Sequence, residues 1–322
     1  MMKKILFVAL LSTVFMNAQS LERQVIGSSG TSFSNATAQL DFTVGELAVT
    51  TLSNGSNDLT QGFHQTNLQV TIKVSPAAFL QGPLLTSGTS IMDDGIRATG
   101  NLPTVSPYGD AISADASVFT VTGNDAIIDW VWVELRDEND NTMVVASTSA
   151  LLQADGDIVA TDGVSPVSFD ISAKNYFVAV NHRNHLGIMT NAAVALSTTT
   201  ATVDFRDGLL ATNGSNAQTT FGLVSGDYAM WAGDALGNGN VKFQGADNDS
   251  NPIRDDVVNA PGNIFGSIGY NYEGYHYTDV NMNGFAKFSG AANDSNIIRD
   301  NVINHPGNIF GSISFVFTQQ IP

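Results

Sequence analysis

A short loop near the C-terminus carries oxygen-bearing side chains on alternate residues. Asp279, Asn281 and Asn283 are spaced two apart, and Gly284 follows directly. This pattern matches the opening of an EF-hand calcium loop, where glycine at the sixth position permits a sharp bend. Calcium takes about six to eight hard oxygen ligands, which alternate side chains of a tight turn can supply. The bend would aim the next main-chain carbonyl, that of Phe285, at the same point.

The acid that closes an ordinary EF-hand is missing from its usual place. Gly290 occupies that twelfth position, and Asp294 follows four residues later. Asp294 opens a stretch in which Ile298 and Val302 lie one helical turn apart, which predicts a helix. We therefore expect Asp294 to complete the ligand shell across a four-residue insertion. The alternative role for Asp294 is that of a helix N-cap.

The loop belongs to a tandem repeat. Residues 234–268 align with residues 279–313 at a constant offset of 45, and 24 of the 35 aligned pairs are identical. Duplication of this kind predicts that both copies keep the same local structure.

The first copy of the loop has a weaker set of ligands. Asp234, Asn238, the carbonyl of Asn240 and Asp249 stand at the corresponding places, but Leu236 replaces the second oxygen donor. We expect lower calcium affinity, or an empty site, in this copy. The alternative for both loops is a plain Asp/Asn/Gly turn that binds no metal.

Other polar clusters give less specific signals. His182 and His185 have a spacing that can bind zinc, although on a strand they would point to opposite faces. Asp155, Asp157 and Asp162 lie beside glycines that favour hairpin turns over a further calcium site. Patterns typical of a nucleophile elbow, a phosphate loop or a dinucleotide site do not occur. We therefore expect no enzymatic activity.

Aromatic residues suggest a second kind of function. Trp130 and Trp132 lie on one face of an expected strand, and four tyrosines fall within residues 270–277 between the two repeats. Such side chains can stack on sugar rings. They can equally cover the joint between the repeats.

The rest of the chain reads as mainly β structure. Short segments with alternating apolar and polar residues are separated by turn signals such as Asn54-Gly55, and this pattern is typical of half-buried strands. Sequence patterns predict five segments: a signal peptide over 1–18, a small N-terminal β module over 19–74, an irregular connection over 75–111, an antiparallel β-sandwich over 112–230, and the repeats over 231–322.

The N-terminus predicts export from the cell. Lys3 and Lys4 precede the apolar run 5–16, and the polar residues after Ala18 mark a cleavage site. A formal net charge of −17 disfavours nucleic acid and anionic lipid as partners. Because the chain has no cysteine, disulfides cannot stabilise it, and bound metal is the remaining candidate.

Several of these motifs resemble one group of proteins. The segments 128–136, 182–187 and 230–234, together with the repeats, are similar to secreted Bacteroidetes surface proteins that are labelled hemagglutinin-like. That resemblance implies an extracellular or outer-membrane surface location, and dockerin-like calcium repeats. We expect a calcium-binding adhesion protein whose partner is a surface protein or a glycan, with a carbohydrate-binding accessory module as the alternative.

Overall fold

The computed structural model describes residues 27–34, 39–46, 52–53, 58–59 and 71–322. The chain forms two compact units, Met1–Leu68 and Gln69–Pro322. The predicted signal peptide lies outside the described residues. Strands hold 29% of the chain and helices 15%, which confirms the prediction of a mainly β protein. Among the described residues, no helix has the length and apolar character needed to cross a membrane.

The first unit contains short antiparallel strands. Two pairs are described: β1 (Gly27–Ser34) with β2 (Gln39–Glu46), and β3 (Leu52–Ser53) with β4 (Asp58–Leu59). The pairing of β3 with β4 agrees with a hairpin around Asn54-Gly55, although these turn residues lie outside the described ranges.

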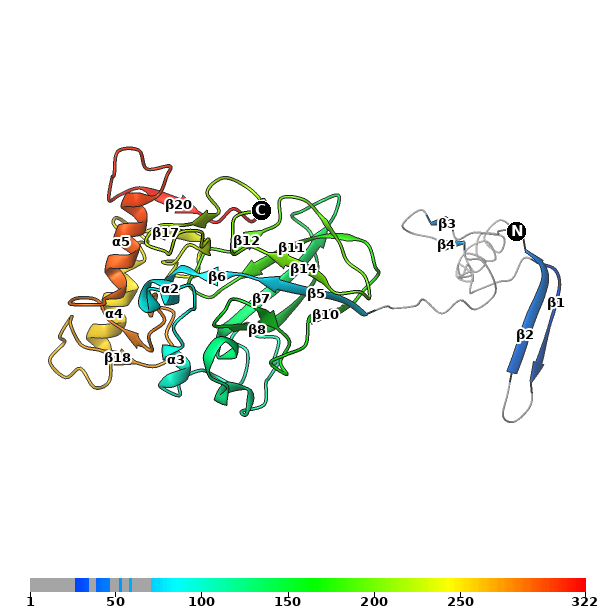
Figure 1. Ribbon diagram of the computed structural model, residues 1–322, viewed down its shortest axis with the longest axis horizontal. Helices are drawn as coiled ribbons and strands as arrows, with labels where there is room; N and C mark the ends of the chain where they lie inside the picture. The colour runs from blue at the N-terminus through cyan, green and yellow to red at the C-terminus, as the bar shows by residue number, and fades with distance from the viewer. Residues whose placement is uncertain (1–26, 35–38, 47–51, 54–57, 60–70) are drawn as a thin grey trace, which may run out of the picture. The chain divides into compact units, whose positions relative to one another are not determined.

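The second unit is built on a curled antiparallel sheet (Figure 1). Its central strand β7 (Ile127–Asp137) has Val131, Val133 and Leu135 fully buried, as the alternation of the sequence predicts. Register shifts along the β7–β8 pairing mark bulges, which bend a sheet. The remaining strands are β8 (Val144–Gln153), β9 (Ile158–Val159), β11 (Asn175–Asn181), β12 (Ile188–Met189) and β13 (Val194–Ala195).

Two small mixed sheets flank the main sheet. Their members are β10 (Val167–Asp170), β5 (Thr71–Ala77) and β14 (Ala201–Asp204) in one, and β15 (Gln218–Thr219), β16 (Ala229–Met230) and β6 (Phe79–Leu80) in the other. The predicted β-sandwich over 112–230 is not confirmed. Strands β10 and β14 do not belong to the main sheet. They pair with β5, which lies outside residues 112–230.

Strand β5 also differs from its predicted place in the N-terminal module. Ile72 and Val74 are fully buried in the core of the second unit, so the apolar side of this strand holds it there. The predicted irregular connection over 75–111 contains two helices, α2 (Gln81–Ser87) and α3 (Gly95–Ala98). Pro83 lies in the first turn of α2, where a missing N–H costs no helical hydrogen bond.

The two repeats exchange strands. In the first, β17 (Asn240–Lys242) pairs with β20 (Val316–Thr318), which follows the helix of the second repeat. In the second, β19 (Phe285–Ala286) pairs with β18 (Tyr272–Glu273), which follows the helix of the first repeat. The pairs Phe317 with Val241 and Tyr272 with Ala286 are equivalent after the offset of 45 residues. Each repeat therefore completes the other, and the repeats form one folded piece.

One helix follows each loop, and the two helices share a core. These helices are α4 (Ser250–Asn259) and α5 (Asp294–Asn304), which pack together at one end of the unit (Figure 1). Their apolar residues Ile253, Val257, Ile298 and Val302 are fully buried, and within each helix they lie one turn apart.

Helices α2 and α3 contact the second loop directly. A Cβ atom on Gly82 would lie 2.1 Å from the carbonyl oxygen of Val280, and one on Gly95 would lie 2.7 Å from the Cα atom of Asn283. The Thr86 hydroxyl donates a hydrogen bond to the main-chain oxygen of Asn281 at 3.0 Å. This close approach makes the repeats and the main sheet one compact unit instead of the separate domains predicted.

We expect Gly95→Ala to destabilise the protein by separating α3 from the second loop. An alanine at the start of a helix would by itself add about 0.5–1 kcal/mol of stability, whereas overpacking a well-filled contact costs about 1–3 kcal/mol. Urea unfolding of the full chain should show a lower midpoint. Gly269→Ala is the control, since its Cβ would meet nothing closer than the Ser289 oxygen at 3.7 Å. An unchanged midpoint for Gly95→Ala would contradict the contact.

Candidate functional site

The second loop gathers oxygen atoms around its own backbone. The main-chain N–H of Asn283 lies 3.2 Å from Oδ1 of Asp279 and 3.0 Å from Oδ1 of Asn281, so both oxygens face one atom. The other oxygen of Asp279 accepts from the N–H of Gly284 at 2.9 Å. Oδ1 of Asn283 accepts from the N–H of Phe285 at 3.0 Å. A carboxylate or amide oxygen that accepts one N–H retains a lone pair for a cation.

Asp294 reaches back into this loop from the start of α5. Its Oδ1 accepts from the N–H groups of Val280 and Asn281 at 2.8 and 2.9 Å, and its Oδ2 accepts from Lys287 at 2.8 Å. The N-cap role belongs instead to the preceding residue, Asn293, whose side chain accepts from the N–H of Asn296. The alternative of Asp294 as an N-cap is therefore wrong.

We infer from the neighbouring residues that the carbonyl of Phe285 points toward the Asp294 side of the loop. Lys287 both donates its N–H to Asp294 and accepts from the main-chain N–H of Asp294 at 2.9 Å. Gly284 directs its own carbonyl the opposite way, to the N–H of Gly274 on the partner strand. Since alternate residues of a strand face the same side, the carbonyls of Phe285 and Lys287 share one direction.

The first loop repeats this geometry. Asp234 accepts from the N–H groups of Asn238 and Gly239 at 2.8 Å each, as its counterpart Asp279 does in the second loop. Asp249 accepts from Leu236 at 3.1 Å and from Lys242 at 2.8 Å. By the same alternation, we infer that the carbonyl of Asn240 faces the Asp249 side of the loop. Leu236 is 43% exposed and contributes only its main chain.

In each loop two carboxyl groups are buried close together. Asp249, Asp279 and Asp294 have no exposed surface, and Asp234 is 6% exposed. Burial, and then the charge of Asp279, raises the pKa of Asp294 well above its usual range. Burial also raises the pKa of Asp249 to about 7, with a further contribution from the charge of Asp234. Uncompensated negative charge is therefore costly at both sites.

These donor sets fit a hard cation. Every candidate ligand is an oxygen atom from a carboxylate, an amide or the main chain, which is the set that calcium prefers. Within the described part of the chain, no three His, Asp or Glu side chains form a metal-binding group. A cation in either loop would therefore depend on amide and carbonyl oxygens for its remaining ligands.

A second polar cluster is buried between the sheet and the repeats. The fully buried Asp129 of β7 accepts from Nε of Arg183 at 2.8 Å and from the hydroxyl of Tyr275 at 2.6 Å, and it pairs with Nε2 of His182 at 3.1 Å. The guanidinium of Arg183 also lies over the ring of Tyr275, 4.3 Å from its centre. This cluster fixes the linker between the two repeats to the central strand.

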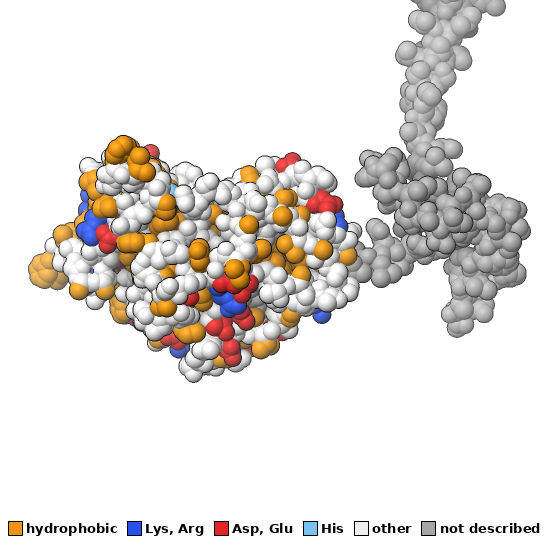
Figure 2. Space-filling model, turned by 45° about the horizontal axis from the view of Figure 1, so that its top comes forward, with side chains coloured by type: hydrophobic (Ala, Val, Ile, Leu, Met, Phe, Trp, Pro, Cys, Tyr) orange, Lys and Arg blue, Asp and Glu red, His pale blue; other side chains and the backbone are white. Residues whose placement is uncertain are grey.

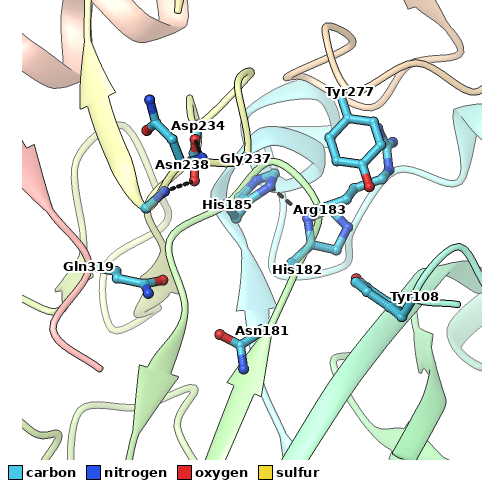
Figure 3. A pocket seen from close by; sticks show the side chains of 11 residues that line it. Tyr108, Asn181, His182, Arg183, His185, Asp234, Gly237, Asn238, Tyr277 and Gln319 are labelled. Carbon is cyan, nitrogen blue, oxygen red and sulfur yellow. Dashed lines mark hydrogen bonds between the residues drawn. The ribbon is translucent and has the colours of Figure 1, made fainter. Parts of the chain in front are cut away.

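The two histidines contact each other and show no zinc-like arrangement. Their Nδ1 atoms are 3.1 Å apart, and Nε2 of His185 accepts from the N–H of Gly82 at 3.1 Å (Figure 3). Burial lowers the pKa of both side chains, so each is a neutral imidazole at neutral pH. The histidines would point to opposite faces only on a strand, but β11 ends at Asn181 and they lie in the turn after it, where their rings meet.

Neighbouring Asn184 connects the starts of both loops. Its side-chain amide donates to the main-chain oxygens of Tyr277 and Asp279 at 3.0 and 2.8 Å. The main-chain carbonyl of Asn184 accepts hydrogen bonds from the N–H groups of Gly233 and Asp234 at 3.1 Å each.

The sequence reading missed the partners of this cluster. Asp129 and Tyr275 are separated by 146 residues, so no local pattern links them. Asp129, a charged residue inside the otherwise apolar run 127–133, was the one available signal. The Tyr275 hydroxyl is bonded to Asp129 and its ring is covered by Arg183, so this ring is not free to stack on a sugar. Trp132 is partly exposed, and its ring centre lies 5.8 Å from that of Tyr108.

The remaining acidic turns have local partners. Asp157 forms an ion pair with Arg206 at 3.0 Å, and Asp162 accepts from the N–H groups of Val164 and Ser165. Both belong to glycine-containing turns, as the sequence favours.

Comparison with known proteins gives no match to a family model, to a curated protein or to a solved structure. The resemblance to secreted hemagglutinin-like surface proteins therefore remains a prediction.

We expect Asp129→Asn to destabilise the protein by about 3–5 kcal/mol, because it leaves the buried Arg183 without its counter-charge. Burial alone would raise the pKa of Asp129, but Arg183, His182 and Tyr275 together lower it to about 2. The carboxylate therefore stabilises the fold above the unfolded pKa of about 4, and this stabilisation is lost as the pH falls toward 2.

Thermal melting of both proteins across pH 6 to 2, in steps of about one unit, measures this effect. The gap in melting temperature between wild type and Asp129→Asn should narrow below about pH 4. Replacing the exposed Asp125 by Asn is the control. A gap that stays constant to pH 2 would rule out the ion pair as its source.

Proposed function

We propose that this chain is an exported calcium-binding protein of the cell surface that acts by binding a partner and not by catalysis. One observation carries the proposal. In each repeat, a buried carboxyl group at the start of the loop and another at the start of the following helix share one loop with amide and main-chain oxygens.

Calcium is the cation that these donors suit best. An all-oxygen set favours calcium or magnesium over zinc, and magnesium requires a near-ideal octahedron and retains its water. Asparagine in place of aspartate lowers the ligand charge, which fits the weak sites of extracellular modules. The ligands would be Asp279, Asn281, Asn283, the Phe285 carbonyl and Asp294 in the second loop, and Asp234, Asn238, the Asn240 carbonyl and Asp249 in the first.

The ion would supply positive charge at the centre of each loop. The carboxyl groups would remain ionised, and each would hold the loop, the following strand and the helix in one arrangement through the N–H groups that it already accepts. In a chain without cysteine, this would take the place of disulfides outside the cell.

Exposed apolar tips support binding of a partner. The segment Pro-Gly-Asn-Ile-Phe-Gly-Ser-Ile occurs in both repeats, and Phe265 and Phe310 within it are 91% and 90% exposed. Figure 2 shows hydrophobic side chains on the surface at the end of the unit that carries the repeats. Asn263 and Asn308 hold these tips rigid through hydrogen bonds to flanking main-chain atoms. Rigid apolar tips of this kind suit contact with an apolar surface of a partner protein.

The burial of the polar cluster around Asp129 supports a function without catalysis. The side chains of Asp129, His182 and Arg183 are buried and mainly bonded to one another. A general base needs access to a substrate proton, and the carboxylate of Asp129 is fully buried and bonded to three side chains.

Calcium should raise the thermal stability of the full chain relative to chelator. At a concentration one hundred times Kd, a single site adds about 2.7 kcal/mol, and about 2–4 °C in Tm accompanies each kcal/mol for a domain of this size. We therefore expect a rise of about 5–10 °C, and a smaller one with magnesium. Differential scanning fluorimetry with calcium chloride or EGTA measures it.

Two substitutions on the same helix separate this effect from general charge. Asp294→Asn should lose most of the calcium-induced rise, whereas Asp300→Asn should keep it, because Asp300 is exposed and pairs with Arg299 on the surface. The calcium-induced change in Tm is the quantity compared, so a lower starting stability of either variant does not matter. Equal rises in wild type and Asp294→Asn, or no rise in wild type, would refute the calcium site.

A further inference from the structure

A hollow of about 430 Å³ lies between the first loop and the main sheet (Figure 3). Its wall includes Asn181 at the end of β11, the following segment 182–185, the first loop 234–239, Tyr277 before the second loop, and Gln319 after β20. The volume lies within the range of about 300–1,000 Å³ that is usual for small-molecule sites. Segments distant in sequence thus form one polar concavity.

Three side chains in this hollow are free to bind. Asn181, Tyr277 and Gln319 donate and accept no side-chain hydrogen bonds within the described ranges, and Figure 3 shows them on different sides of the hollow. Tyr277 is 44% exposed, and the other two are half-buried. Two primary amides and a phenol can each donate and accept, so the hollow presents both kinds of partner to a ligand.

Charged groups around the hollow are already committed. Arg183 is paired with Asp129, and Asp234 accepts from main-chain N–H groups. The site therefore suits an uncharged ligand that is rich in acceptor and donor oxygens.

Aromatic surface continues from the hollow along the sheet. Tyr108 lines it, and the ring of Trp132 lies 5.8 Å from the ring of Tyr108. Trp132 is the cross-strand partner of Asn181, so the two side chains share one face of the sheet. A ligand longer than the hollow would therefore contact the rings of Tyr108 and Trp132 beside it.

We propose that this hollow binds one residue of a neutral saccharide. Hydroxyl groups act as donor and acceptor together, which matches the amides of Asn181 and Gln319. The Tyr277 ring packs against the C–H face of the sugar, and Trp132 contacts the next residue of an oligosaccharide. The inference rests on the proposed binding function, because the first calcium loop forms one wall.

Binding of the full chain to an array of neutral, sialylated and sulfated glycans, in calcium chloride, tests the inference. The wild type should retain neutral glycans. Calorimetry with a retained oligosaccharide should then show affinity lower by about tenfold or more for Asn181→Ala and for Tyr277→Ala. Asn124→Ala and Leu209→Ala are the controls, since each removes an exposed side chain that does not line the hollow, and both should bind as wild type does.

The outcomes separate this inference from the calcium proposal. Failure to retain any neutral glycan, retention of charged glycans alone, or full affinity in both Asn181→Ala and Tyr277→Ala would overturn the saccharide site. If that happens while calcium still raises Tm, the saccharide inference alone fails. Glycan binding that depends on Asn181 in a chain without any calcium response would support the hollow and refute the calcium loops.

Discussion

Two carboxyl groups buried side by side in each repeat are the constraint on which the rest of this fold depends. Asp294 is bonded to Val280 and Asn281 at the start of the loop and to Lys287 directly after β19, while its own main chain begins α5. One side chain thereby fixes loop, strand and helix. Main-chain N–H donors offset part of the cost of burying these charges, but the mutual repulsion of the two acids remains. A hard cation between them would remove it.

The same acids hold the exchanged strands in position. The main-chain N–H groups of Lys242 and Lys287 donate to Asp249 and Asp294. Lys242 ends β17, which pairs with β20, and Lys287 directly follows β19, which pairs with β18. Because each partner strand comes from the opposite repeat, disturbance of one loop is transmitted to both. The linker between the repeats is in turn fixed to the main sheet by Asp129, so the loops form a rigid wall for the hollow beside β11.

Local sequence patterns predicted the parts of the site that one repeat contains. Residue spacing predicted the oxygens on alternate residues, the glycine bend and the closing Asp294 of the second loop. The offset of 45 residues predicted the corresponding residues of the first loop. The mainly β composition and the buried aliphatic face of β7 also follow from alternation. Each of these depends on contacts within a few residues.

Long-range contacts explain what the sequence did not predict. Strand β5 joins the second unit through β10 and β14, which follow it by about a hundred residues, as the register of Val74 with Val167 shows. Helix α2, with Gly82 and Pro83, has a low intrinsic helix propensity and forms because the unit buries it. The roles of Arg183, His182 and Tyr275 depend on one carboxylate that is remote from Tyr275 in the chain.

The most direct test of the account is a crystal structure of the full chain grown in calcium chloride, with an anomalous difference map at long wavelength. We expect a peak in the second loop with oxygens of Asp279, Asn281, Asn283, Phe285 and Asp294 at about 2.3–2.6 Å from it. A weaker peak is expected in the first loop, where Leu236 supplies no oxygen. A map without a peak at millimolar calcium, with the carboxyl groups bonded only to main-chain N–H groups, would contradict the account.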